Sequence, residues 1–217
     1  MLGAARAGPR LRSDVNSRTE RRTVAGPAGG LQCAIDSPEG AAHGTAIVCH
    51  PHPQFGGTMD NKVVATLARA FVQCGWRAVR FNFRGIGGSA GAWDEGRGEI
   101  DDALAVTAAL REPGQPLALA GFSFGGYVAS QAAAALRPER LVLVGPATAN
   151  FPVAPVPADT LVIHGEADDV VPLAATLDWA RPQALPVVVV PGVGHFFHGQ
   201  LGLLKSLVVR HLSAPAG

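Results

Sequence analysis

The sequence predicts an α/β fold with a doubly wound, mostly parallel sheet and helices on both faces. From residue 30 onward, short β-rich runs alternate with longer segments of helical pattern, which is the element order of such a sheet. The later β-rich runs, such as "RLVLVG" and "PVVVVP", are apolar throughout, as in strands that helices cover on both sides. With 217 residues, 47% of them hydrophobic, the chain can bury one sizeable core and is short for two domains.

Short apolar runs mark the expected strands. In chain order they are 31–36 "LQCAID", 45–50 "TAIVCH", 77–83 "RAVRFNF", 117–122 "LALAGF", 140–145 "RLVLVG", 160–165 "TLVIHG" and 186–191 "PVVVVP". Pro or Gly breaks the longest apolar stretches, and none reaches the roughly 18 residues that cross a bilayer. No membrane segment is therefore expected.

Helices are expected between these strands, at 61–74, 98–111, 123–136, 172–181 and 199–211. The first has apolar residues at the spacing of a helix with one buried face, and Gly75 follows it as a stop signal. The second carries acidic residues in its first turn, where they suit the helix dipole. The third is rich in alanine and directly follows a strand. The Pro-rich connection 146–159 has no helical period and is too short to build a lid domain.

Residues 1–22 differ in charge from the rest of the chain. Six arginines face two acidic residues there, a local charge of +4 within a total of +1. The segment has neither the apolar core of a secretory signal nor a hydrophobic period. We therefore expect a disordered basic extension over 1–22 and a single domain over 23–217, with a targeting or anion-binding arm as the alternative. The overall charge gives no reason to expect a nucleic-acid partner.

The three cysteines are unclustered and form no C-x-x-C motif. Cys33 and Cys49 fall in expected strands and Cys74 near a helix end, where a small buried thiol is ordinary. An odd number of cysteines without a signal peptide points to a reducing cytoplasm.

A candidate nucleophile lies in "LALAGFSFGG", where Ser123 is the centre of a G-x-S-x-G motif. The motif falls between an expected strand and an expected helix. A tight turn at such a junction needs small flanking residues, which Gly121, Gly125 and Gly126 supply. The turn lifts the hydroxyl clear of the sheet, and the helix N-terminus favours developing negative charge. A glycine-rich turn that only packs helix on strand is the structural alternative.

A serine hydroxyl is a poor nucleophile near neutral pH and needs a base. Downstream, "VIHGEADDVVP" ends one strand with carboxylates and "PGVGHFFHG" ends the next with histidines. Both fall at the carboxyl ends of expected parallel strands, the edge where open α/β sheets place their sites. The order Ser, Asp, His along the chain is the one expected for such a nucleophile turn.

The motifs "GFSFGG", "HGEADDVVP" and "GVGHFF", in this order, resemble the α/β-hydrolase superfamily. "CHPHPQFGGTMDNKVV" with "FNFRGIGGSAG" resembles its small, lidless bacterial branch of esterase-like hydrolases. The resemblance covers the chain from about residue 23 to its end and says little about substrate. It implies Ser123 as nucleophile, His195 as general base and Asp168 as the residue that orients the base.

The neighbouring polar residues have structural interpretations. Asp168 fits the H-G-x-x-D pattern, so Asp169 is expected to be a solvated neighbour. His195 follows the small "GVG" turn, whereas His198 lies a helical step further on and is expected to flank the last helix. His164, within a strand end, is expected to be a satisfied structural histidine.

The segment "HPHPQFGG" after the strand at 45–50 has two interpretations. Acyl transfer needs N–H donors for the oxyanion, one from Phe124 and one from this loop, where the resemblance implies His52. Pro51 and Pro53 have no N–H and would stiffen the loop. A zinc site on His50 and His52 is the alternative, but it lacks an evident third ligand, with Asp60 the nearest in sequence. We expect the oxyanion loop and no metal.

The glycine-rich segment "FRGIGGSAGAWDEGRGEIDD" lacks the spacing of a nucleotide-binding loop. Arg84 is expected to pin its turn. Side chains expected to line the cleft are His50, Gln54, Trp93 and Asp94.

These observations predict a serine hydrolase that cleaves a small ester-type acyl bond through an acyl-enzyme, without a cofactor. Its expected partner is a small acyl substrate. A thioesterase or small peptidase with the same three residues is one alternative. A non-catalytic binding module of the same fold is another, although such a module has no physical need for all three.

Overall fold

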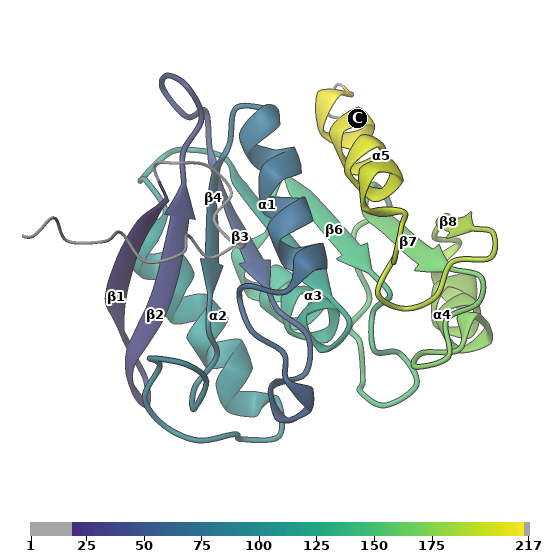
Figure 1. Cartoon of the computed structure of the whole chain (residues 1–217), viewed down its shortest axis with the longest axis horizontal. Helices are drawn as coiled ribbons and strands as arrows, with labels where there is room; N and C mark the ends of the chain where they lie inside the picture. Colours follow the sequence, from purple (N-terminus) through teal and green to yellow (C-terminus); the bar gives the residue numbers. More distant parts are fainter. Residues whose placement is uncertain (1–18, 215–217) are drawn as a thin grey trace, which may run out of the picture.

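The computed structural model describes residues 19–214, which form one mixed sheet between two layers of helices (Figure 1). The sheet has eight strands in the order β1-β2-β4-β3-β5-β6-β7-β8. The strands are β1 Glu20–Gly26, β2 Gly29–Asp36, β3 Thr45–Cys49, β4 Arg77–Phe81, β5 Leu117–Phe122, β6 Arg140–Val144, β7 Leu161–Gly165 and β8 Val187–Val190. In this order, consecutive strands from β4 through β3 to β8 are parallel, and β1 and β2 add an antiparallel hairpin at one edge. The predicted mostly parallel sheet is confirmed.

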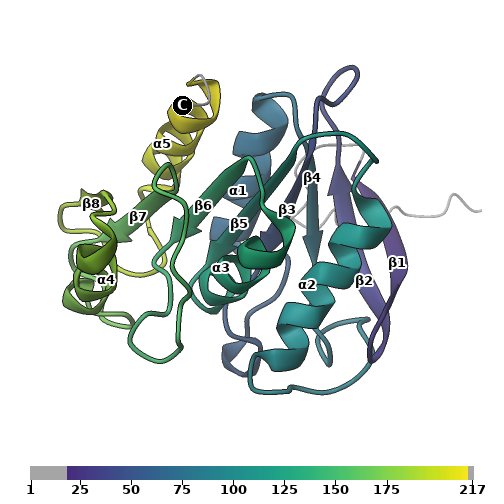
Figure 2. The same ribbon diagram turned by 180° about the vertical axis from the view of Figure 1, so that it is seen from behind.

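Helices cover both faces of the sheet, as predicted. They are α1 Lys62–Gln73, α2 Arg97–Leu110, α3 Phe124–Leu136, α4 Leu173–Ala180 and α5 Leu201–Ser213. Figure 1 shows α1 and α5 on one face, and Figure 2, turned by 180°, shows α2, α3 and α4 on the other. Every predicted helix boundary lies within two residues of the observed one.

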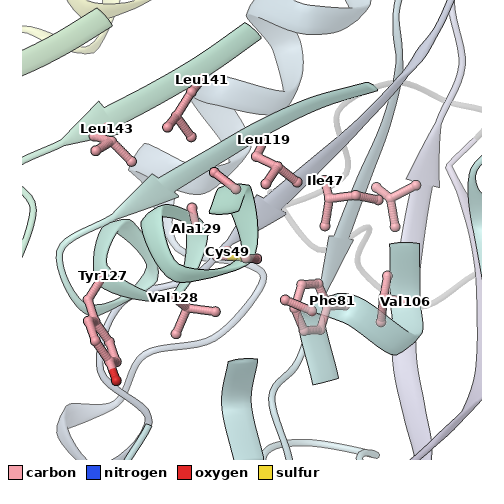
Figure 3. Packing of buried hydrophobic residues seen from close by; sticks show 14 of the residues in the cluster. Ile47, Cys49, Phe81, Val106, Leu119, Tyr127, Val128, Ala129, Leu141 and Leu143 are labelled. Atoms are coloured by element: carbon pink, nitrogen blue, oxygen red, sulfur yellow. The ribbon is translucent and has the colours of Figure 1, made fainter. Parts of the chain in front are cut away.

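The two faces bury two separate apolar cores, which explains the unbroken apolar strands. Under α2 and α3, the side chains of Ile47, Leu119 and Leu143 meet Val106 and Val128 (Figure 3). On the opposite face, Val48, Ala120 and Val144 pack under α1 and α5. Alternate residues of each central strand thus enter opposite cores, so both sides of the strand must be apolar.

Strand β1 is the one element that the sequence pattern did not predict. Its sequence is "ERRTVAG", and Val24 is its one buried residue, because the strand lies at the sheet edge with most side chains in solvent. The predicted domain start at residue 23 is therefore too late, because Glu20, Arg21 and Arg22 already belong to β1 and lie opposite residues of β2. The remainder of the predicted extension, residues 1–18, lies outside the described residues.

The connection between β6 and β7 contains no helix or strand, in agreement with the predicted absence of a lid over this segment. Within residues 19–214, none of the helices combines the length and the apolar character that a bilayer-spanning helix needs.

Candidate active site

Ser123 occupies a strained turn between β5 and α3. Its backbone φ is 55° and ψ is −119°, a conformation that a residue with a side chain rarely adopts. The flanking glycines make the turn possible. A Cβ atom on Gly121 would lie 2.0 Å from the carbonyl oxygen of Gly125, and one on Gly125 would lie 2.2 Å from that of Cys49. The G-x-S-x-G motif thus has a steric cause here, and it presents the Ser123 side chain to a cavity at the strand ends.

Asp168 and His195 come from the loops after β7 and β8 and form a close pair. The imidazole Nδ1 of His195 lies 2.7 Å from Oδ2 of Asp168. The other carboxylate oxygen accepts the N–H groups of Val170 at 3.0 Å and Val171 at 2.8 Å. Burial by itself would raise the pKa of Asp168, but the hydrogen bond from His195 and the two backbone donors outweigh it and lower that pKa. The ionised carboxylate therefore fixes the hydrogen on Nδ1 and leaves Nε2 of His195 as a proton acceptor.

The structure brings the three predicted residues to one place. Ser123 and His195 line the same cavity, and Asp168 lies behind His195 and is 7% exposed. Gly145, at the end of β6, was missed by the sequence analysis. Its φ is 47°, and a Cβ there would lie 3.4 Å from both Asp168 Oδ2 and His195 Nδ1, so a side chain would press on the pair. A glycine directly after an apolar strand was the available signal.

The neighbouring candidates have other surroundings. Asp169 and His198 are exposed and line a second depression, formed with the loop after β8. His164 is fully buried, and its Nε2–H donates to the carbonyl of Val171 at 2.9 Å and lies 3.5 Å from Asp168 Oδ2. Its Nδ1 has no partner among residues 19–214, so the prediction of a fully satisfied histidine is half right.

The loop after β3 lies against the start of α3. A Cβ on Gly125 would lie 2.6 Å from the carbonyl oxygen of His50, so only glycine lets the helix approach this closely. The N–H of Phe124 opens the helix and has no acceptor within it. The N–H of His52 has no acceptor among the described residues. These two N–H groups are the predicted oxyanion donors: Phe124 directly follows Ser123, and His52 lines the same cavity as Ser123.

The imidazole of His50 is committed to hydrogen bonds at both nitrogens. Nε2 accepts the N–H of Phe83 at 3.1 Å, which leaves the hydrogen on Nδ1 to donate to the carbonyl of Pro51 at 2.6 Å. Burial lowers the pKa of His50 to about 3. The ring therefore braces the loop after β3 against the segment that follows β4 and has no lone pair left for a metal.

The other groups considered for zinc are also engaged. Nδ1 of His52 accepts the N–H of Gln54 at 3.2 Å, and Asp60 pairs with Arg80 at 3.1 Å. Within residues 19–214, no group of three or more His, Cys, Asp or Glu side chains is arranged to hold a metal ion.

Because His50 is neutral in the fold and has a pKa of 6.5 when unperturbed, it links stability to pH. Between pH 6.5 and about 3, the unfolded chain binds a proton there that the folded chain does not. We expect the free energy of unfolding to be lost progressively as the pH falls through this window, and to fall less steeply in His50→Gln. Chemical denaturation at successive pH values measures this. Equal slopes in both proteins would contradict it, and His43→Gln, which removes an exposed histidine, is the control.

A cavity of about 400 Å³ opens beside Ser123, within the size range of small-molecule sites. It is lined by Pro51, His52, Phe55, Gly56, Gly57, Asn61, Ser123, Val170, His195 and Phe196. Phe55, Val170 and Phe196 are exposed apolar side chains at its rim. Sequence reasoning missed these three residues and Asn61, because isolated residues in loops carry no periodic pattern.

The four side chains predicted to line the cleft are not among those that line this cavity. His50 is buried, and Gln54 is exposed. Trp93 packs behind His52, with ring centroids 4.6 Å apart. Asp94 faces Arg97 at 3.4 Å. The glycine-rich loop is instead held by Arg84, which pairs with Asp102 at 2.8 Å as predicted for its pinning role.

Comparison with known proteins agrees with this geometry. Residues 42–157 match the model of a hydrolase family described as "Serine aminopeptidase, S33". An uncharacterised protein of Rickettsia prowazekii is 34% identical over 170 residues, 70% of this chain and 71% of the relative. Among solved structures, XC6422 of Xanthomonas campestris, described as an α/β serine hydrolase without a lid, is 41% identical. It superposes with a TM-score of 0.85 over 92% of this chain and 98% of that one. An α/β serine hydrolase homologue of Coxiella burnetii is 39% identical, with a TM-score of 0.79 over 89% and 97%.

Proposed function

The chain belongs to the α/β serine hydrolases, and on this basis we propose that it hydrolyses small, uncharged carboxylic esters. Ser123 Oγ attacks the ester carbonyl while Nε2 of His195 takes its proton. The N–H groups of His52 and Phe124 stabilise the oxyanion. His195 then protonates the leaving alcohol, and a water molecule activated by the same imidazole releases the acid from the acyl-enzyme.

The observation that supports this proposal most strongly is the pair between Asp168 and His195 beside a strained serine. The 2.7 Å hydrogen bond orients the imidazole, and the depressed pKa of Asp168 keeps a negative charge next to the imidazolium that forms. Ser123 is held at a positive φ in the same cavity, at an energetic cost that a merely structural turn would not need.

The charge of the cavity favours esters over aminoacyl substrates. None of its ten lining residues is Asp, Glu, Lys or Arg. An aminopeptidase must bind a free α-ammonium group, and a wall without a carboxylate leaves that charge uncompensated. The exposed rim of Phe55, Val170 and Phe196 suits an apolar acyl or alcohol group instead. The three free thiols, two of them buried, are in keeping with a cytoplasmic location.

Turnover of three matched substrates tests the reaction class. We expect kcat/KM to be highest for a p-nitrophenyl ester, lower for the acyl-thioester with the same acyl group, and lowest for an aminoacyl anilide. An anilide turned over faster than the ester would establish a peptidase. Labelling by a fluorophosphonate without turnover of any of the three would indicate a serine hydrolase that acts on another class of substrate. Absence of labelling would favour a non-catalytic binding module.

A further inference from the structure

The cavity wall contains two polar side chains that the proposed mechanism does not use, the amide of Asn61 and the imidazole of His52. Both belong to the segment between β3 and α1 that forms one side of the cavity. In each side chain one polar atom already accepts a hydrogen bond from the backbone, and the polar atom that is left is a hydrogen-bond donor.

The amide of Asn61 is oriented by the helix that it caps. Its Oδ1 accepts the N–H of Val63 at 2.8 Å and that of Val64 at 3.4 Å, so the oxygen is committed to the N-terminus of α1. The Nδ2–H₂ group is the remaining polar part of the side chain, and among residues 19–214 the side chain's hydrogen bonds are the two that Oδ1 accepts. Because the cap forbids the flipped amide, this position offers donors to the cavity and no acceptor.

The loop that carries Asn61 is held from below by side chains of β4 and the residue after it. Arg80 is fully buried and donates to the carbonyl of Met59 at 3.0 Å and to Asp60 at 3.1 Å. Asn82 Oδ1 accepts the N–H of Met59 at 2.8 Å. These bonds fix the backbone directly before Asn61, so its donor is preorganised and binding need not order it.

The imidazole of His52 is fixed in a similar way. Its Nδ1 accepts the N–H of Gln54, so the neutral ring carries its hydrogen on Nε2. The ring lies among four aromatic side chains, with centroids 4.6 to 5.8 Å away. Burial lowers the pKa of His52, which favours this neutral form.

The direction of the proposed reaction divides the cavity wall into two parts. His195 protonates the leaving oxygen, so we assign the alcohol to the part of the wall that belongs to the loops of Asp168 and His195, with Val170 and Phe196. We assign the acyl chain to the part that belongs to the segment between β3 and α1, with Phe55, Gly57 and Asn61.

We propose that the preferred substrate is a neutral ester whose acyl chain carries a second acceptor oxygen, as an ether, hydroxyl or carbonyl group, which accepts a hydrogen bond from Asn61 Nδ2. His52 Nε2 is a second donor on the same wall. This inference rests on the proposed ester hydrolysis and narrows it to oxygen-bearing acyl groups. A plain hydrocarbon chain would leave both donors unpaired in the occupied cavity, at a cost that selects against it.

Matched ester pairs test the inference. In each pair, one p-nitrophenyl ester has an unbranched acyl chain, and the other has an ether oxygen in place of one methylene, moved stepwise along the chain. For wild type we expect kcat/KM to favour the oxygen-bearing ester at one position by roughly three- to tenfold, the usual scale of one neutral hydrogen bond. The comparison between enzyme variants cancels the intrinsic reactivity that the oxygen adds to the ester.

Two variants remove the amide donor and keep the cap: Asp has no donor when ionised, and Ser has only a shorter hydroxyl. Asp and Ser are both good N-cap residues, so Asn61→Asp and Asn61→Ser should melt near wild type while lacking Nδ2–H₂. We expect both to lose the preference for the oxygen-bearing ester, whereas Asn61→Ala should lose stability as well. The inference is overturned if Asn61→Asp, which has no donor in this side chain, keeps the wild-type preference. Equal turnover of both members of every pair by wild type would also overturn the inference, but the proposed ester hydrolysis would stand. No turnover of any ester would instead refute the proposed function itself.

Discussion

Ser123→Ala is expected to abolish ester turnover, with a loss in kcat on the order of a millionfold, the scale found when a nucleophilic serine of such a triad is removed. Without Oγ, no acyl-enzyme can form, and neither Asp168 nor His195 can replace the nucleophile. The fold should persist, because the Ser123 side chain makes no capping hydrogen bond to α3 and alanine takes up less space. Steady-state turnover and thermal melting together measure the two effects.

The matched control is Ser206→Ala, on the exposed face of α5. Its hydroxyl bonds only to the carbonyl of Gly202, at 3.0 Å, so removal should change neither labelling by a fluorophosphonate nor turnover. Labelling that persists in Ser123→Ala and disappears in another serine variant would show that Ser123 is not the nucleophile.

The second large effect concerns the backbone N–H of His52, which proline abolishes. His52 has φ −52°, close to the value that the proline ring imposes, and its N–H makes no hydrogen bond to another described residue. His52→Pro therefore removes one oxyanion donor while fitting the existing backbone. We expect kcat to fall about a hundredfold or more relative to His52→Ala, the usual scale for one such donor.

The comparison with His52→Ala separates the N–H from the imidazole, because both variants lack the ring and only proline lacks the donor. His52→Ala itself should lose modestly, through the ring packing of Trp93 and Phe124 and through substrate contact. His195→Ala marks the deeper loss expected when a proton-transferring imidazole is removed. If the two His52 variants were equally active with similar melting temperatures, the backbone-donor role would be wrong.

The sheet and the site residues were predictable from sequence for a common reason. The central strands are buried on both sides and are therefore recognisable in the sequence as apolar runs. Parallel strands bring their carboxyl ends to one edge of the sheet. Ser123 directly follows such a run, and Asp168 and His195 lie in the loops after two others, so their proximity follows from topology. Edge strand β1 was not predictable in this way, because only Val24 of it is buried.

The cavity walls were not predictable because they depend on which side of a loop each side chain faces. His50 and His52 are two residues apart in one motif, yet the first is buried as a brace between β3 and β4 and the second lines the cavity. The role of Arg80 as a loop anchor could likewise not be predicted, since its partners Met59 and Asp60 lie in another segment of the chain. Such contacts between distant segments leave no periodic trace in the sequence.

Rapid-quench mass spectrometry of the wild-type protein with a p-nitrophenyl ester tests the central claim most directly. A covalent acyl-enzyme should appear within the first turnover as one added acyl mass, on the peptide that contains Ser123. The adduct should be absent in Ser123→Ala and should decay with the steady-state rate once the ester is consumed. Ester turnover without any adduct, or an adduct on another residue, would contradict nucleophilic catalysis by Ser123.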